Sequence, residues 1–230
     1  MESVVNTVMG VADGEAETSR QPVTGGSPDW PVIGTYLGGT LAQIGVMVLW
    51  LYVLDQFGDS LTAPWSTGAA IAFFTLLAIR SRLFSPLNNA RTRNTYTSVQ
   101  RPAWAPPPLA FPVIWMGIAV LRVAASYLVW QQLGANYLSW PLGLFVIHLA
   151  LGDTWNTIFT VEGRLGAAVP AVLLGPLASA CVVAWSYGQA EPLAGWLLVP
   201  MVLWLAVASA LVLSIWSLNG AEPWYPLKQD

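Results

Sequence analysis

Six long runs of this sequence contain no Asp, Glu, Lys or Arg, and each is about as long as the roughly 20 apolar residues that cross a bilayer as a helix. Only 9% of the residues are charged, whereas a soluble domain carries about 25%. The runs are continuously apolar and do not alternate as the strands of a transmembrane barrel do. The sequence therefore predicts an all-α, multi-pass membrane protein. The uncharged runs are residues 31–54, 61–79, 102–121, 123–152, 165–190 and 192–221.

Turn-forming residues set the expected helix boundaries. Gly134, Asn136 and Pro141, for example, separate the third helix from the fourth. Residues 1–30 are acidic and polar and lack the features of a secretory signal or a transit peptide, so we interpret them as a flexible tail. The sequence predicts six transmembrane helices, near residues 31–55, 63–83, 109–131, 139–160, 165–187 and 193–218, and a C-terminal tail at 221–230.

The basic residues predict the orientation in the membrane. With six helices, every Lys and Arg except Arg122 falls on one side of the bilayer. Positive residues remain on the cytoplasmic side during insertion, so both termini are expected in the cytoplasm, or in the stroma of a plastid. The membrane would be a bacterial inner membrane, a thylakoid or another organelle membrane. The residues on this side are Arg20, Arg80, Arg82, Arg91, Arg93, Arg101, Arg164 and Lys228.

A proline- and tryptophan-rich segment, RPAWAPPPLAFPVIW at residues 101–115, connects the second and third helices. Prolines fix φ and favour extended neighbours, so the segment is a stiff approach to a helix. Together with Tyr96, its residues resemble in order and spacing the signature of the TspO/MBR family of translocator proteins. The matching positions are Tyr96, Arg101, Pro102, Trp104, Pro106, Pro107, Phe111 and Trp115.

Three further segments resemble the same family in the correct order. They are SYLVW at 126–130, LALGDTWNTIF at 149–159 and LLVPMVLWLAVASALVLSIWSLN at 197–219. The resemblance implies a five-helix transmembrane bundle over residues 58–220. Residues 31–57 would then be an additional N-terminal transmembrane helix.

The resemblance also implies a ligand pocket inside the bundle, near the proline-rich connector. Flat aromatic walls with few polar groups suit a large planar apolar ligand. The positions that match the family's pocket are Trp104, Pro106, Pro107, Phe111, Trp115, Trp155, Asn156, Phe159, Pro200, Trp204 and Ala208.

Several pocket positions depart from the family pattern. Met201 stands where the family usually has Tyr, Gly152 where it has Asn, and Val212 where it has Asn. Ala119 replaces a Tyr, and Arg122 stands where a methionine is common. Several polar groups that face the ligand in the family are therefore altered, and these changes bear on the identity of the ligand more than on the fold.

Arg122 and Asp153 lie within expected transmembrane helices, where an ionisable group costs roughly 2.5–3.5 kcal/mol or more. Arg122 lies about 18 Å and Asp153 about 11 Å from the basic face, at about 1.5 Å per residue. We therefore predict an intramembrane ion pair between them, with a polar handle for a ligand carboxylate as the alternative. His148 could ligate the metal of a tetrapyrrole, but a hydrogen-bonded histidine inside the bundle is the simpler interpretation.

The family resemblance implies a membrane receptor for porphyrin, haem, chlorophyll or similar flat molecules, such as sterols. Light-dependent porphyrin degradation at Trp115 and Trp204 is a further implication, although the chain carries no enzyme signature of its own. The alternative is a structural or pigment-binding subunit of a larger, photosynthetic membrane complex, with bound chlorophyll or carotenoid. We expect no required cofactor, no nucleic-acid partner, and contact with lipids. Small residues such as Gly175 and Ala178 would permit a homodimer.

Overall fold

The structure is a computed structural model that describes residues 26–58, 65–87 and 98–228. These residues form helices long and apolar enough to cross a membrane six times, in the order and near the positions that the sequence predicts. Residues 1–25 of the predicted acidic tail, and Tyr96, Arg91 and Arg93 of the connector, lie outside the described residues.

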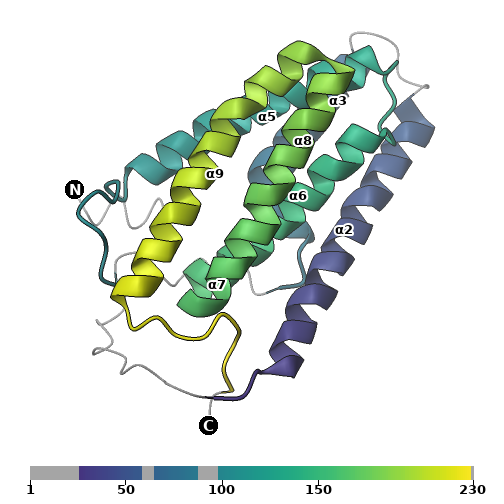
Figure 1. Ribbon diagram of the computed structural model, residues 1–230. Coiled ribbons are helices and arrows are strands. Elements are labelled where there is room, and N and C mark those ends of the chain that lie inside the picture. Colours follow the sequence, from purple (N-terminus) through teal and green to yellow (C-terminus); the bar gives the residue numbers. More distant parts are fainter. Residues whose placement is uncertain (1–25, 59–64, 88–97, 229–230) are drawn as a thin grey trace.

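Three spans are single helices, and the second continues from α3 into a short 3₁₀ helix, η1; the labels are those of Figure 1. The fourth span continues from α6 through a π-helical turn, η2, and the fifth consists of α7, the π-helical turn η3 and α8. The elements are α2 (Trp30–Gly58), α3 (Trp65–Arg80), η1 (Ser81–Phe84), α5 (Ala110–Gln132), α6 (Trp140–Asn156), η2 (Thr157–Val161), α7 (Leu165–Val172), η3 (Leu173–Leu177), α8 (Ala178–Ala190) and α9 (Pro192–Leu218).

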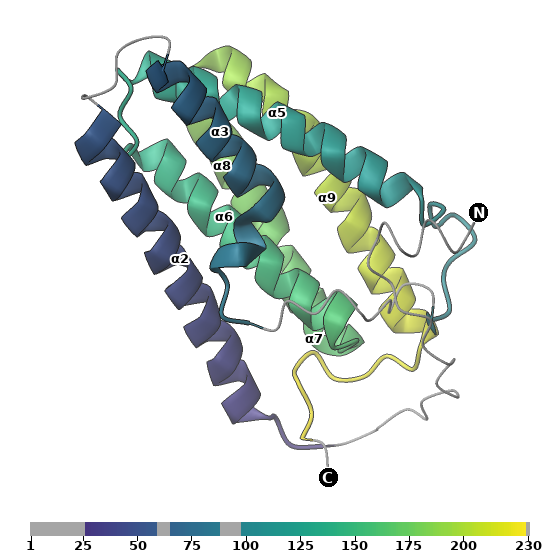
Figure 2. The ribbon, with the colours of Figure 1, turned by 180° about the vertical axis from the view of Figure 1, so that it is seen from behind.

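Five spans form a bundle and α2 lies at its edge (Figures 1 and 2). α9 packs between α5 and α8, α3 packs on α5, and α6 packs on α8. α2 packs on α6 and on η1. The predicted additional N-terminal helix is therefore present, and it covers one side of the bundle.

The helix ends follow from local sequence. Glu191 separates α8 from α9, and its side chain accepts a hydrogen bond from the backbone N of Leu193 at 3.2 Å. Pro192 occupies the first turn of α9, where its missing N–H is no loss. After α5, Gly134 adopts φ 70°, a left-handed conformation that suits glycine and ends the helix.

Two glycines permit a close crossing of α8 and α9. A Cβ added at Gly195 would lie 2.6 Å from the Cα of Gly188 and 3.1 Å from the carbonyl oxygen of Ala184. Contacts this short leave no room for a side chain. The two helix backbones therefore touch at this point, as small residues allow in membrane bundles.

The two described chain ends meet at one end of the bundle. Pro28 and Leu227 form an antiparallel bridge, and the backbone N of Asp29 donates to the carbonyl of Pro226 at 2.8 Å. Residues 26–29, predicted as part of the flexible tail, are thus held by the C-terminal segment.

Candidate functional site

An aromatic cluster at the connector end of the bundle contains four of the eleven predicted pocket residues. Phe111 of α5 and Trp204 of α9 meet edge to face, with ring centroids 5.6 Å apart. Trp155 and Phe159 stack at 6.0 Å with nearly parallel rings, and Trp155 and Phe111 pack against the same hydrophobic cluster. Aromatic side chains from α5, α6, η2 and α9 thus lie in two pairs, linked by the packing of Phe111 and Trp155 on one hydrophobic cluster.

Burial divides the predicted pocket residues into three groups. Phe159 and Ala208 are buried, and the half-buried residues are Pro106, Phe111, Trp115, Trp155, Asn156 and Trp204. Trp104 is 51% exposed, and Pro107 and Pro200 are also exposed, so these three do not line the interior.

Three side-chain polar atoms in this region are enclosed without a hydrogen-bond partner among the residues that the structure describes. They are Nε1 of Trp155, Oδ1 of Asn156 and Nε1 of Trp204. An unsatisfied buried polar group costs about 1–3 kcal/mol, and each such group needs an explanation. Two indole donors and one amide acceptor in this region thus have no hydrogen-bond partner among the described residues.

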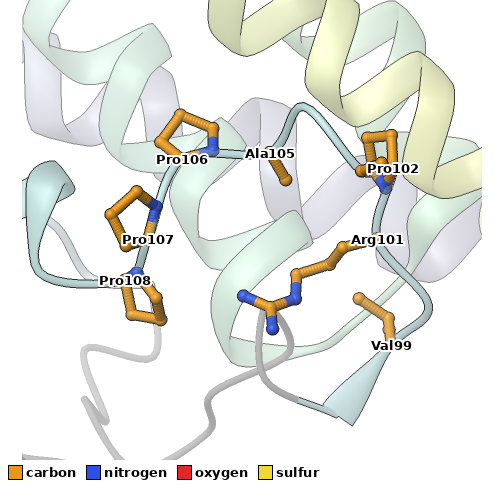
Figure 3. Close-up of a pocket in the computed structure, with 8 residues that line it drawn as sticks. Val99, Arg101, Pro102, Ala105, Pro106, Pro107 and Pro108 are labelled. Carbon is orange, nitrogen blue, oxygen red and sulfur yellow. The ribbon is translucent and has the colours of Figure 1, made fainter.

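The connector forms an open hollow of about 560 Å³ beside the bundle (Figure 3). The connector is held in place by Asn219, whose side chain accepts from the backbone N of Gln100 at 3.0 Å and donates to the carbonyl of Gln100 at 2.9 Å. Of the predicted pocket residues, Pro106 and Pro107 line the hollow. The hollow is lined by Val99, Arg101, Pro102, Ala103, Ala105, Pro106, Pro107 and Pro108.

Arg122 is buried on the inner face of α5, and its partners are uncharged. Nε donates to Sδ of Met201 at 3.1 Å, Nη2 lies 2.9 Å from Nε2 of His148, and the guanidinium carbon lies 5.7 Å from the centroid of Trp115. Nδ1 of His148 lies 2.9 Å from Oγ of Ser179. His148 is thus a hydrogen-bonded bundle histidine, and its second ring nitrogen is occupied by protein.

Asp153 has different partners, so the predicted ion pair with Arg122 requires correction. Its Oδ2 accepts from Nε2 of Gln43 at 2.8 Å and from Oγ of Ser81 at 2.7 Å, and its Oδ1 lies 3.9 Å from Nε of Arg82. In the described part of the chain, Arg122 is not within ion-pair distance of Asp153. Depth along a helix does not fix which way a side chain faces around it, so residues at similar depths need not meet.

A polar seam attaches α2 to α6, and sequence reasoning missed it. Tyr36 donates to the carboxylate of Glu162, and the hydroxyls of Thr40 and Thr154 lie 2.6 Å apart. Gln43, which bonds Asp153, continues the same face of α2. Helical spacing in the sequence could have indicated this seam, because Tyr36, Thr40 and Gln43 lie three or four residues apart within an otherwise apolar run and so share one face of the helix.

Asp55 fixes the other end of α2. Its Oδ1 accepts from the backbone N of Tyr137 at 2.9 Å and of Leu138 at 3.4 Å. Burial, and then the neighbouring Asp55 carboxylate, raise the pKa of Tyr137 to about 12, so its hydroxyl stays protonated at neutral pH. α2 is therefore anchored along its whole length.

Known proteins resemble this chain over most of the bundle. Residues 69–217 match the TspO/MBR family. The chain is 33% identical to a translocator protein of Sus scrofa over 159 residues, which are 68% of this chain and 92% of that protein. It is 34% identical to protein CrtK of Rhodobacter capsulatus over 131 residues, 55% of this chain and 79% of that protein.

A more distant relative is a tryptophan-rich sensory protein of Cereibacter sphaeroides, 28% identical over 128 residues, 56% of this chain and 78% of that protein. The family match begins within α3 and ends within α9. α2 precedes the matched region, so the polar seam joins the family bundle to a helix outside the match.

Proposed function

We propose a function for this chain, which belongs to the TspO/MBR family. It is a membrane receptor for a flat hydrophobic molecule of the tetrapyrrole type. The ligand would lie against the aromatic cluster of α5, α6, η2 and α9. Planar aromatic walls favour stacking with a planar ligand, and apolar burial supplies most of the binding free energy.

The observation that carries this proposal is the set of enclosed polar atoms without partners in the described part of the chain. Nε1 of Trp155 and Nε1 of Trp204 are donors, and Oδ1 of Asn156 is an acceptor. Ligand pockets typically combine apolar walls with a few such polar groups that fix the orientation of the ligand. Molecules with ring nitrogens or carbonyls would satisfy groups that otherwise reduce the stability of the protein.

Fluorescence titration with protoporphyrin IX tests the proposal. We expect saturable quenching of tryptophan emission by the wild type, and weaker binding for Trp115→Ala and Trp204→Ala. Removing one indole wall costs about 1–3 kcal/mol, or about five- to 150-fold in Kd. Trp140, which is 72% exposed at the start of α6, provides the control, because Trp140→Ala should leave Kd unchanged.

The indole donors can be tested separately from the rings. Trp155→Phe removes Nε1 but keeps an aromatic side chain, so it should weaken binding while the free protein becomes no less stable. Equal losses for all three Trp→Ala variants would indicate porphyrin dissolving in detergent around the protein. Absence of saturable binding, together with co-purified pigment and partner proteins, would support a structural subunit instead.

A further inference from the structure

Arg122 brings a positive charge into the bundle, and among the described residues no carboxylate lies within ion-pair distance of it, although its charge interacts with that of Asp153 over a longer range. Its side chain is 9% exposed, and its hydrogen bonds go to Met201 and His148. Asp153 makes its contacts with Gln43, Ser81 and Arg82. A charge held in a membrane interior is costly and usually faces a partner or a functional cavity.

The hydrogen bonds around His148 fix the direction in which protons are donated. Oγ of Ser179 donates its one hydrogen to the carbonyl of Gly175, which lies in the widened turn η3, at 2.7 Å. The same Oγ must therefore accept from Nδ1 of His148. Nε2 of His148 is then unprotonated and accepts from Nη2 of Arg122. His148 thus orients the guanidinium as a neutral acceptor and does not neutralise its charge.

The guanidinium has N–H groups that donate to none of the described residues. Nη1 of Arg122 donates to none of the described residues and is not among the enclosed polar atoms. Nη2 has a second hydrogen beyond the one directed at His148. Two adjacent N–H groups therefore remain in the planar fork that binds both oxygens of a carboxylate.

The position of this fork relates it to the aromatic site. The guanidinium carbon lies 5.7 Å from the ring centroid of Trp115, and Met201 lies on α9 less than one full turn before Trp204. Arg122 and Met201, both departures from the family pattern, are in direct contact. They therefore form one altered polar region beside the aromatic walls.

We propose that Arg122 binds a carboxylate of the hydrophobic ligand, which makes this protein selective for acidic planar molecules. The inference rests on the proposed function, because the aromatic cluster must hold the rest of the ligand. His148 and Ser179 are positioning residues, since they orient the guanidinium through hydrogen bonds and do not reach the ligand themselves.

The test compares protoporphyrin IX, which has two carboxylates, with its dimethyl ester, which has none. A charge-assisted hydrogen bond to an ionised group is strong enough to give the wild type about a 10- to 100-fold preference for the acid. Arg122→Met, which introduces the residue common in the family, should abolish this preference and retain binding of the ester. Comparing the acid-to-ester ratio of Kd between proteins cancels the greater partitioning of the ester into detergent.

Each outcome separates this inference from the proposed function. Equal Kd values for acid and ester in the wild type, or the same preference in Arg122→Met, would overturn the carboxylate site and leave the receptor proposal intact. If the wild type binds neither compound, both proposals are wrong. If Arg122→Met binds neither, Arg122→Lys decides, since it keeps the charge and should retain part of the preference, and equal binding of acid and ester by that variant would refute the site.

Discussion

The two ionisable residues in the middle of the bundle are accommodated in different ways. Asp153 receives two hydrogen bonds, from Gln43 and Ser81, and lies near Arg82. Among the described residues, the hydrogen-bond partners of Arg122 are the uncharged side chains of Met201 and His148. The carboxylate is therefore part of the structural seam that holds α2, whereas the guanidinium contacts α6 and α9 instead.

Asp153 should consequently be coupled energetically more strongly to Gln43 than to Arg122. We expect Gln43→Ala and Asp153→Ala to be non-additive in a double-mutant cycle, with an interaction free energy of about 0.5–3 kcal/mol, because they share a 2.8 Å hydrogen bond. Thermal or denaturant unfolding in detergent measures the free energy.

The matched control is the cycle of Arg122→Met with Asp153→Ala. Arg122 and Asp153 share no hydrogen bond and interact only through their charges at longer range, so this cycle should give a smaller interaction free energy than the cycle of Gln43 and Asp153. Strong coupling there, with none between Gln43 and Asp153, would restore the ion pair that depth along the helices suggested.

At the level of elements, the sequence predicted the helices well because hydrophobicity decides them. The run from 31 to 54 could only be a span, and α2 begins at Trp30 and ends at Gly58. The rotation of each helix about its own axis was harder to predict from the sequence. Nothing in the sequence around Pro200 shows that its ring faces outward, and the ring's exposure follows only from how α9 packs between α5 and α8.

The hydrogen-bond partners of Asp153 could not be predicted from the sequence for a related reason. Asp153 could be recognised as an unusual residue from its neighbours in sequence, but its partners Gln43 and Ser81 are 110 and 72 residues away. Only the packing of α2 and η1 on α6 brings them together. Family signatures could not supply this contact either, because α2 precedes the matched region.

The crossing of α8 and α9 gives a prediction at this scale. Gly195→Ala should destabilise the bundle by about 1–3 kcal/mol, the usual cost of overpacking, because the new methyl would meet backbone atoms of Gly188 at 2.6 and 2.9 Å. Gly188→Ala is the matched control, since its Cβ would meet the Cα of Gly195 at an ordinary 3.7 Å. Unfolding midpoints of the two variants in detergent provide the measurement. If both variants unfold alike, the helices are not in backbone contact.

At the scale of the whole molecule, the C-terminal segment ties the start of α2 to the base of the bundle. Glu222 is central to this arrangement, because its carboxylate accepts from the backbone N of Gly166 at 2.7 Å and its carbonyl accepts from Nε1 of Trp216 at 2.7 Å. Arg164 donates to the carbonyl of Leu227 at 3.3 Å. The segment therefore joins α2, α7 and α9 on the side where the sequence places most of the basic residues.

This arrangement predicts that both chain ends react from the same side of the membrane. The backbone N of Lys228 lies 3.3 Å from the carbonyl oxygen of Ser27, so an even number of spans separates two adjacent segments. The chain has a single cysteine, Cys181, which is exposed on α8. Cys181→Ser therefore gives a background without thiols, into which one cysteine is placed at residue 10, at Ser27 or at Lys228.

Labelling of sealed inverted and right-side-out vesicles with a membrane-impermeant maleimide measures the topology. All three cysteines should react from one side only, and by the distribution of basic residues that side is the cytoplasmic one. As an independent check, the double variant Ser27→Cys with Lys228→Cys should crosslink under mild oxidation, because the two backbones are adjacent, whereas residue 10 lies outside the described structure. Reaction of Ser27→Cys and Lys228→Cys from opposite sides would contradict the six-span arrangement, and with it the contacts that attach α2 to the family bundle.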